Sequence, residues 1–157
     1  AVESIRVRGW QIAYRHVFPP ARLDALPIDE TRWRGRFVEP PAGWSTFVAE
    51  EDDEILGFAS IGPSRDEAGI GELYAIYVDP DSWSRGAGRA LLARAEETLA
   101  STYAEATLWV LSANMRARRF YEQAGWRVDG ASKSEEHLGV SSEETRYRKT
   151  VATSSRS

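Results

Sequence analysis

Just past its midpoint the chain reads Trp83-Ser84-Arg85-Gly86-Ala87-Gly88-Arg89-Ala90-Leu91-Leu92. Two glycines flank one small residue, an arginine stands on each side, and an apolar helical pattern follows at once. Glycine lets backbone N–H groups approach a bulky anion, and the first turn of a helix leaves several N–H groups unpaired. Together with the helix dipole and the charges of Arg85 and Arg89, these groups are typical of a phosphate site. The alternative is a loop that only opens a helix.

The segments around this loop alternate between predicted strands and helices. Residues 71–80 form an aromatic and β-branched run that ends in Asp-Pro, and residues 106–111 form a second apolar run. Both patterns predict buried strands, and the helix between them is expected to end near Ala100. A short helix is predicted over 114–126, with Asn114 as its N-cap and Gly125 just past its end. Its apolar face repeats at helical spacing: Ala117, Phe120, Tyr121 and Ala124.

This order and these motifs resemble the GNAT superfamily of acetyl-CoA-dependent N-acetyltransferases, over roughly Phe47 to Tyr147. The resemblance implies an α/β fold with a mixed, mostly antiparallel central sheet flanked by helices. A splayed pair of strands in that sheet is expected to hold the cofactor. Residues 1–150 are predicted to form one domain of this type, and 151–157 a flexible tail. Family members usually begin with a strand before the first helix. None is evident here, so a missing N-terminal strand is expected.

The other predicted elements fill out the same domain. They are a helix over 2–16, a helix starting near Asp29, a hairpin of Trp44–Glu50 with Ile55–Ile61, and a final strand pair over 126–130 and 143–150 around a polar loop.

Composition narrows the function further. A chain of 157 residues has the length of one domain, and it contains no cysteine. A disulfide framework, a thiolate metal site and an acetyl-cysteine intermediate are therefore excluded, which favours direct attack by the amine in a ternary complex. Two histidines far apart in sequence suggest no metal site, and the net charge of −4 argues against nucleic acid. No apolar run reaches membrane-spanning length. We expect a cytoplasmic enzyme, monomeric or homodimeric.

Two residues are candidates for the proton transfers of acetyl transfer. Glu72, six residues before Val78, has the spacing at which some members of the resembled family carry a glutamate base, and burial on a strand would raise its pKa. The alternatives are a solvated glutamate, a water chain, or a share of the work by Tyr74. Tyr121 matches the family tyrosine that lies near the sulfur of coenzyme A and donates to the leaving thiolate. The simpler alternative is a core tyrosine that packs beside Phe120.

The resemblance also implies which residues bind acetyl-CoA. Backbone groups of Ile76, Tyr77 and Val78 are expected to bind the acetyl carbonyl and the pantetheine amides, and Asn114 the pantetheine arm. The phosphates are expected on the loop formed by Ser84, Arg85, Gly86, Ala87, Gly88, Arg89 and Ala90. One position departs from the family pattern, because Trp83 stands where glutamine or arginine is common. Backbone N–H groups with Arg85 and Arg89 then have to bind the phosphates.

The acceptor is predicted only as a small-molecule or peptide amine. The loop around 131–142 and aromatic residues of the N-terminal half are expected on the acceptor side, although most of these aromatics suit a core equally: Trp10, Tyr14, Trp33, Phe37 and Trp44. A second hypothesis is an acyl-CoA-binding sensory or regulatory module with little activity. A nucleotide-binding domain of Rossmann type is excluded, because Leu91 stands where its third glycine is required.

Overall fold

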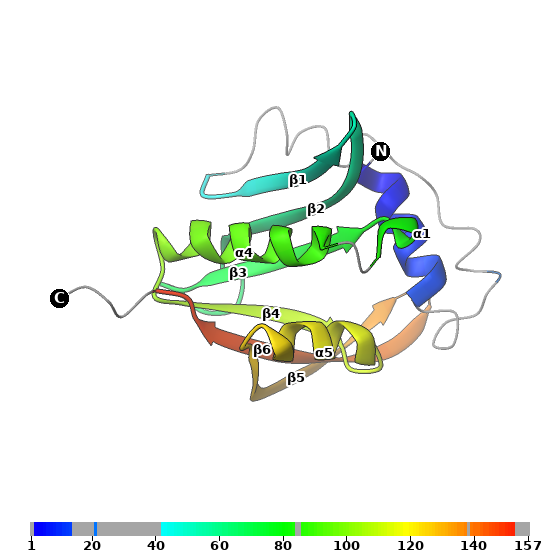
Figure 1. Ribbon diagram of the computed structural model, residues 1–157. Coiled ribbons are helices and arrows are strands. Elements are labelled where there is room, and N and C mark those ends of the chain that lie inside the picture. The colour runs from blue at the N-terminus through cyan, green and yellow to red at the C-terminus, as the bar shows by residue number, and fades with distance from the viewer. Residues whose placement is uncertain (1, 14–20, 22–41, 84–85, 138, 153–157) are drawn as a thin grey trace.

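The computed structural model of the chain describes residues 2–13, 21, 42–83, 86–137 and 139–152. They form a six-stranded sheet in the order β1-β2-β3-β4-β6-β5 (Figure 1). The strands are β1 (Ser45–Glu51), β2 (Glu54–Pro63), β3 (Gly71–Val78), β4 (Glu105–Leu111), β5 (Arg127–His137) and β6 (Val140–Thr150). The helices are α1 (Val2–Ala13), the 3-10 helix η1 (Pro80–Ser82), α4 (Ala87–Ala100) and α5 (Met115–Gln123). The predicted mixed, mostly antiparallel sheet is confirmed, because only β3 and β4 pair in parallel.

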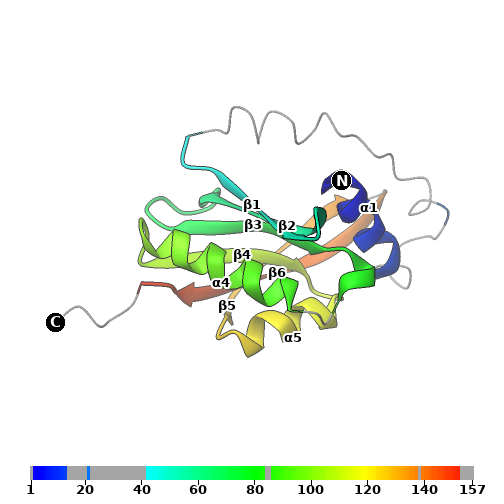
Figure 2. The same cartoon turned by 45° about the horizontal axis from the view of Figure 1, so that its top comes forward.

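The helices lie on two faces of this sheet. Figures 1 and 2 show α4 and α5 on one face, which we call the helix face. There the apolar side of α4 is buried, with Leu91, Ala95 and Leu99 packed into the core with Leu73 and Leu108. Helix α1 packs on the opposite face, where a smaller cluster is formed by Phe58, Ala75 and Tyr77. We call this second side the open face. Among the described residues, no helix is long and apolar enough to cross a membrane.

The β1–β2 hairpin forms as predicted and has a two-residue turn. Asp52 and Asp53 occupy the left-handed region with φ of 51° and 64°. Turns with two left-handed residues match the right-handed twist of the flanking strands, and aspartate tolerates this conformation better than most residues. The acidic turn therefore sets the register beside it, with Glu51 opposite Glu54 and Glu50 opposite Ile55, and an irregularity between Ala49 and Glu50 shifts the register of the rest of the hairpin.

Strands β3 and β4 pair only at their starts. The parallel ladder joins Gly71–Leu73 to Ala106–Leu108, whereas β3 continues to Val78 and β4 to Leu111. Figure 1 shows the far end of β3 leaving β4 toward α1. The splay expected from the sequence is thus present at the middle of the sheet.

A β-bulge marks the point where β3 leaves β4. Ile61 of β2 pairs with Leu73 and Ser60 with Ala75, so Tyr74 is an extra residue on β3. An extra residue reverses the alternation of side chains and bends the strand. Leu73 and Ile76 both pack on the helix-face core for this reason, although they are three residues apart.

The last hairpin is longer than predicted. Residues 131–137, expected in a polar loop, belong to β5, and β6 begins at Val140 rather than near residue 143. Serine, lysine and glutamate favour strands weakly, but the ladder from Ser132 opposite Thr145 to His137 opposite Val140 outweighs this local preference.

Some predictions concern the ends of the described segments. Val151, next to the predicted domain boundary at residue 150, is buried, and its N–H and that of Ala152 donate to the carbonyl of Ala104. The end of the predicted first helix (14–16), the helix expected near Asp29, and residues 153–157 of the predicted tail lie outside the described residues.

Candidate active site

A cavity of about 870 Å³ lies where β3 and β4 diverge. It is lined from the helix face by the start of α4 and by α5, and from the open face by α1, the β2–β3 loop and β5. The splayed halves of β3 and β4 form its central walls. A single space therefore connects the two faces of the sheet through the gap that the splay leaves between the two strands.

The start of α4 forms the end of this cavity that the glycine motif predicts. Gly86 is the N-cap, with φ of 88°, and no side chain caps the helix. The N–H groups of the first helical turn have no acceptor within a helix, and they carry the positive end of the dipole. Gly86, Gly88 and Arg89 line the cavity, whereas Ala87 and Ala90 are not part of its wall. Ser84 and Arg85 lie outside the described residues.

Trp83 and Arg116 form a pair beside this helix end. The Trp83 indole N–H donates to the carbonyl of Val78 at 2.9 Å, and the Arg116 guanidinium lies 3.6 Å from the centre of the Trp83 ring. Both residues line the cavity. Trp83 thus holds a cation over its face at the position where the sequence itself offers none. The sequence analysis missed Arg116, because its contact with Trp83 spans the splay and belongs to no local motif.

The predicted pantetheine residues lie along the cavity. Ile76, Tyr77 and Val78 line it from β3, and Asn114 lines it from the start of α5. Asn114 is also the predicted N-cap, since its Oδ1 accepts the N–H of Ala117 at 3.1 Å. The Val78 carbonyl already accepts the bond from Trp83, so one lone pair of that oxygen is occupied.

Tyr121 reaches the same cavity from the buried side of α5. Its side chain is 9% exposed, and its ring meets Phe120 edge-on at 5.3 Å. Within the described residues its hydroxyl makes no hydrogen bond. Burial, together with the nearby Tyr77, raises the pKa of the Tyr121 hydroxyl far above its ordinary value. The hydroxyl therefore stays protonated and is able to donate a hydrogen bond into the cavity.

Glu72 is placed differently from the other predicted residues. Its side chain is completely buried and is not part of the cavity wall. Oε1 accepts the backbone N–H of Arg65 at 2.9 Å, and Oε2 accepts Nε and Nη2 of Arg65 at 3.2 and 2.6 Å. Arg65 itself lines the cavity. The catalytic role of Glu72 stays a prediction, and its contacts favour the positioning of Arg65.

Side chains on the open face complete the cavity. Tyr74 stacks on Trp44 at 4.1 Å and donates its hydroxyl to the carbonyl of Pro63. On β5, Lys133 Nζ lies 4.3 Å from the centre of the Trp109 ring and pairs with Glu135 at 3.1 Å. Lys133 and Glu135, from the segment 131–142 that the sequence places on the acceptor side, line this part of the cavity, and so does Glu144, a carboxylate that the sequence did not single out. Of the predicted acceptor-side aromatics other than Trp44, the structure describes no side chain: Trp10, Tyr14, Trp33 and Phe37.

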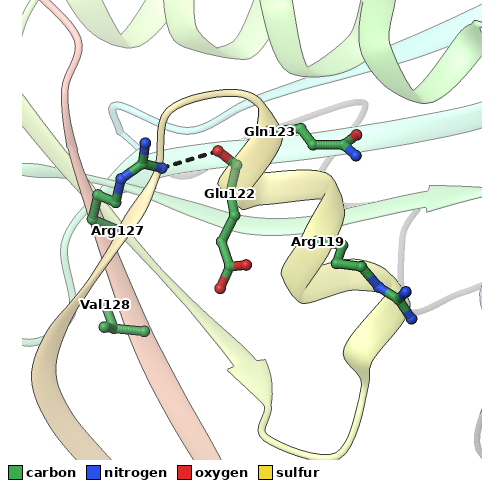
Figure 3. Close-up of a pocket in the computed structure, with 5 residues that line it drawn as sticks. All are labelled: Arg119, Glu122, Gln123, Arg127 and Val128. Carbon is green, nitrogen blue, oxygen red and sulfur yellow. Dashed lines mark hydrogen bonds between the residues drawn. The ribbon is translucent and has the colours of Figure 1, made fainter.

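A second, smaller hollow of about 460 Å³ lies between α5 and the start of β5 (Figure 3). Five residues line it: Arg119, Glu122, Gln123, Arg127 and Val128. Arg127 donates to the backbone carbonyl of Glu122 at 2.9 Å, as the dashed line shows. None of these residues lines the large cavity. In the described part of the chain, no group of three histidines, aspartates or glutamates is arranged to hold a metal ion.

Comparison with known proteins shows the family to which the chain belongs. The model of the acetyltransferase (GNAT) family matches residues 7–126. The N-acetyltransferase YuaI of Bacillus subtilis is 34% identical over 119 residues, which are 72% of this chain and 66% of YuaI. A mycothiol acetyltransferase of Kocuria rhizophila is 39% identical over 97 residues, which are 57% of this chain and 32% of that protein. The chain thus spans about two thirds of the first relative and about one third of the second.

Solved structures share the fold. A ribosomal-protein-alanine N-acetyltransferase of Brucella melitensis superposes with a TM-score of 0.69 at 21% identity, covering 96% of both chains. The PaiA N-acetyltransferase of Thermoplasma acidophilum, solved with coenzyme A, gives a TM-score of 0.67 at 17% identity. That match covers 94% of this chain and 89% of PaiA. At these identities the likeness establishes the fold alone.

Proposed function

Because the chain belongs to the acetyltransferase (GNAT) family, we propose that it moves an acetyl group from acetyl-CoA to a primary amine. The amine attacks the thioester directly while both substrates are bound. One observation carries this proposal: the cavity in the splay contains the free N-terminus of α4, the bulged strand β3 and the buried hydroxyl of Tyr121. An amine reaches the thioester from the open face, while acetyl-CoA enters from the helix face.

Acetyl-CoA is proposed to bind along the helix face. Its phosphates contact the first-turn N–H groups after Gly86, with Arg89 and Arg116 as cations. Arg116 thereby supplies the charge that the motif lacks at Trp83. The pantetheine arm follows Ile76–Val78 toward the bulge.

The chemistry is proposed to centre at the bulge. Attack of the amine nitrogen on the thioester carbon forms the C–N bond and places negative charge on the carbonyl oxygen. Backbone N–H groups of β3, released from the β4 ladder by the splay, stabilise that oxygen. The C–S bond then breaks, and Tyr121 donates to the thiolate of coenzyme A. The raised pKa of Tyr121 favours a hydrogen bond to the thiolate over complete transfer of the proton.

The proton of the amine has two proposed routes. Glu72 is the candidate base predicted from the sequence, but it has to release its hydrogen bonds with Arg65 before it can accept a proton. A water held in the cavity near Tyr74 is the second route, with the Glu144 carboxylate on the cavity wall as the proposed acceptor of the proton. Comparing Glu72→Gln with Glu144→Gln separates the two. A base loses its step in the pH–rate profile at saturating acceptor, whereas a positioning residue changes KM for the acceptor.

A panel of amines tests the function itself. Acetyl-CoA is incubated with the protein and each amine, and free coenzyme A is measured together with the acetylated product. Intersecting double-reciprocal lines are expected for the productive amine. Parallel lines, or an acetylated enzyme that passes its acetyl group on, contradict the direct mechanism. Micromolar binding of acetyl-CoA without turnover of any amine supports the regulatory module instead.

A further inference from the structure

The ion pair of Arg65 with Glu72 is strongly asymmetric. The carboxylate is completely buried, whereas the Arg65 side chain is 58% exposed and lines the cavity. A buried charge is costly unless it is paired and hydrogen-bonded, and an exposed ion pair adds little stability. Glu72 satisfies both of its oxygens with one arginine and that arginine's own backbone. The arrangement fixes the direction of the arginine more than it stabilises the fold.

The loop that carries Arg65 is itself held in place. Ser64 donates its N–H to the carbonyl of Ile70 at 2.9 Å and accepts the N–H groups of Asp66 and Glu67 on its hydroxyl. Asp66 accepts the indole N–H of Trp109 at 2.6 Å. These contacts tie the β2–β3 loop to β4 beneath the cavity. Arg65 is therefore positioned before any ligand arrives.

One edge of the Arg65 guanidinium remains for a ligand. Nε and Nη2 face Glu72, and within the described residues Nη1 makes no hydrogen bond. The guanidinium also lies 5.1 Å from the centre of the Tyr74 ring, next to the bulge. A planar guanidinium with fixed direction suits a carboxylate or phosphate, which it binds with two parallel N–H bonds.

We propose that Arg65 binds an oxyanion group, carboxylate or phosphate, carried by the amine acceptor, and that Glu72 is its positioning residue. The inference rests on the proposed acetyltransferase function and names the class of its acceptor. The acceptor is an amine with a negative group close to the nitrogen, as in an amino acid or an aminoalkyl phosphate. Lys133, the other cation that lines the open-face half, is paired with Glu135 at 3.1 Å, so Arg65 is the cation proposed to meet the anion.

Matched acceptor pairs test this. Alanine is compared with alaninamide, and phosphoethanolamine with ethanolamine, in wild type, Arg65→Gln, Arg65→Lys, Glu72→Gln and the control Arg119→Gln. Arg119 lies in the hollow of Figure 3, so its loss removes an equal charge outside the cavity. Turnover is measured with each acceptor, and calorimetry measures acetyl-CoA binding and the binding of each acceptor to the coenzyme A complex.

Wild type is expected to prefer one anionic member by at least about 10-fold in kcat/KM, the scale of one charge-assisted hydrogen bond. Arg65→Gln is expected to lose this preference through KM for the acceptor, Arg65→Lys to keep part of it, and Glu72→Gln to weaken it through the same KM. Acetyl-CoA affinity stays unchanged in all, and Arg119→Gln behaves as wild type. The preferred pair identifies the oxyanion as carboxylate or phosphate.

Other results would contradict either the role of Arg65 or the proposed acetyltransferase function, but not both. Equal use of both members by wild type, or a preference that survives Arg65→Gln, overturns the role of Arg65 while the acetyltransferase function stands. Binding of an anionic amine that depends on Arg65, with no acetyl transfer, supports the anion site and contradicts the proposed function. Absence of any Arg65-dependent binding overturns the inference whatever the turnover.

Discussion

The two halves of the cavity are built in opposite ways. On the helix face, the predicted phosphate site spans residues 84–90, and its described part is a helix start where Gly86, Gly88 and Arg89 line the cavity. On the open face the wall consists of side chains from β3, β4, β5 and the β2–β3 loop, held by ion pairs such as Arg65 with Glu72. Ligand binding in the helix-face half should therefore depend mainly on backbone conformation and less on individual side chains. Ligand binding in the open-face half should depend mainly on individual side chains.

The largest effect is expected from the backbone of the helix-face half. Gly86→Val forces a β-branched residue into φ of 88°, although the space around the position is open. The N–H groups then turn away from the phosphates. Several hydrogen bonds to charged groups, about 1.5–3 kcal/mol each, are lost, so the affinity for acetyl-CoA falls about 1,000-fold or more in calorimetry.

Gly130→Val is the matched control, since Gly130 has φ of 90°, equally open surroundings and no part in the cavity. This variant is expected to have the same backbone strain as Gly86→Val but to keep the wild-type affinity for acetyl-CoA. Unchanged affinity in Gly86→Val would remove the phosphate site from α4.

Next in size is the hydroxyl of Tyr121, the side chain of the helix-face half that we propose takes part in the chemical step. Tyr121→Phe keeps the ring and its packing but removes the donor for the thiolate. We expect turnover to fall by about 100-fold at saturating acetyl-CoA, the lower end for a positioned proton donor. The melting temperature is expected to change little.

Tyr147→Phe gives the opposite pattern. The Tyr147 hydroxyl donates to Glu122 at 2.6 Å and accepts from Arg118 at 2.9 Å under the same helix. Its loss costs about 1–3 kcal/mol in urea unfolding and leaves turnover near wild type. Full activity of Tyr121→Phe would make Tyr121 a core residue only.

Arg116 tests whether a side chain supplements the backbone site. Arg116→Ala is expected to lower the affinity for acetyl-CoA by about 10-fold. This effect is smaller than the loss of a buried charge-assisted hydrogen bond would cause, because the site is open to water. Acetyl-pantetheine, which lacks the nucleotide phosphates, is expected to bind both proteins equally in calorimetry. A similar loss with both ligands would show that Arg116 acts on the pantetheine arm or on folding.

The smallest effect is predicted for the charge network of the open face. Burial raises the pKa of Asp129, but hydrogen bonds from Ala131 and Arg146 outweigh it and hold the pKa below its ordinary value. A depressed carboxyl pKa stabilises the fold above that ordinary value, and the contribution disappears as pH falls below about 4. Asp129→Asn should cost about 1 kcal/mol in urea unfolding at pH 7 and less at pH 3.

Asp81→Asn is the control for this experiment, because Asp81 pairs with Arg8 at the surface and is 82% exposed. No change is expected there at either pH. An Asp129→Asn defect of equal size at both pH values would mean that the charge of Asp129 contributes nothing.

The sequence predicted what is encoded locally. The α4 start, the Asn114 cap and the β1–β2 turn each depend on a few adjacent residues, and all were found where expected. The contact of Arg116 with Trp83 joins positions 33 residues apart across the splay, and that of Glu72 with Arg65 requires the β2–β3 loop to fold back. No periodicity encodes such contacts. Strand β5 was missed beyond residue 130 for the same reason, since its polar residues form a strand only because β6 pairs with them.

The order of the strands has a consequence for how the cavity is assembled during synthesis. Strand β6 follows β5 in the chain but lies between β4 and β5. Until residues 140–150 have left the ribosome, β4 presents a bare edge to solvent, and β5, which carries Lys133 and Glu135, has no strand of the sheet to pair with. The part of the open-face wall that β5 contributes can therefore join the sheet only after β6 has been made. Its assembly depends on pairing over long sequence separation, which is slow, so the nascent chain is open to edge-to-edge association in that interval.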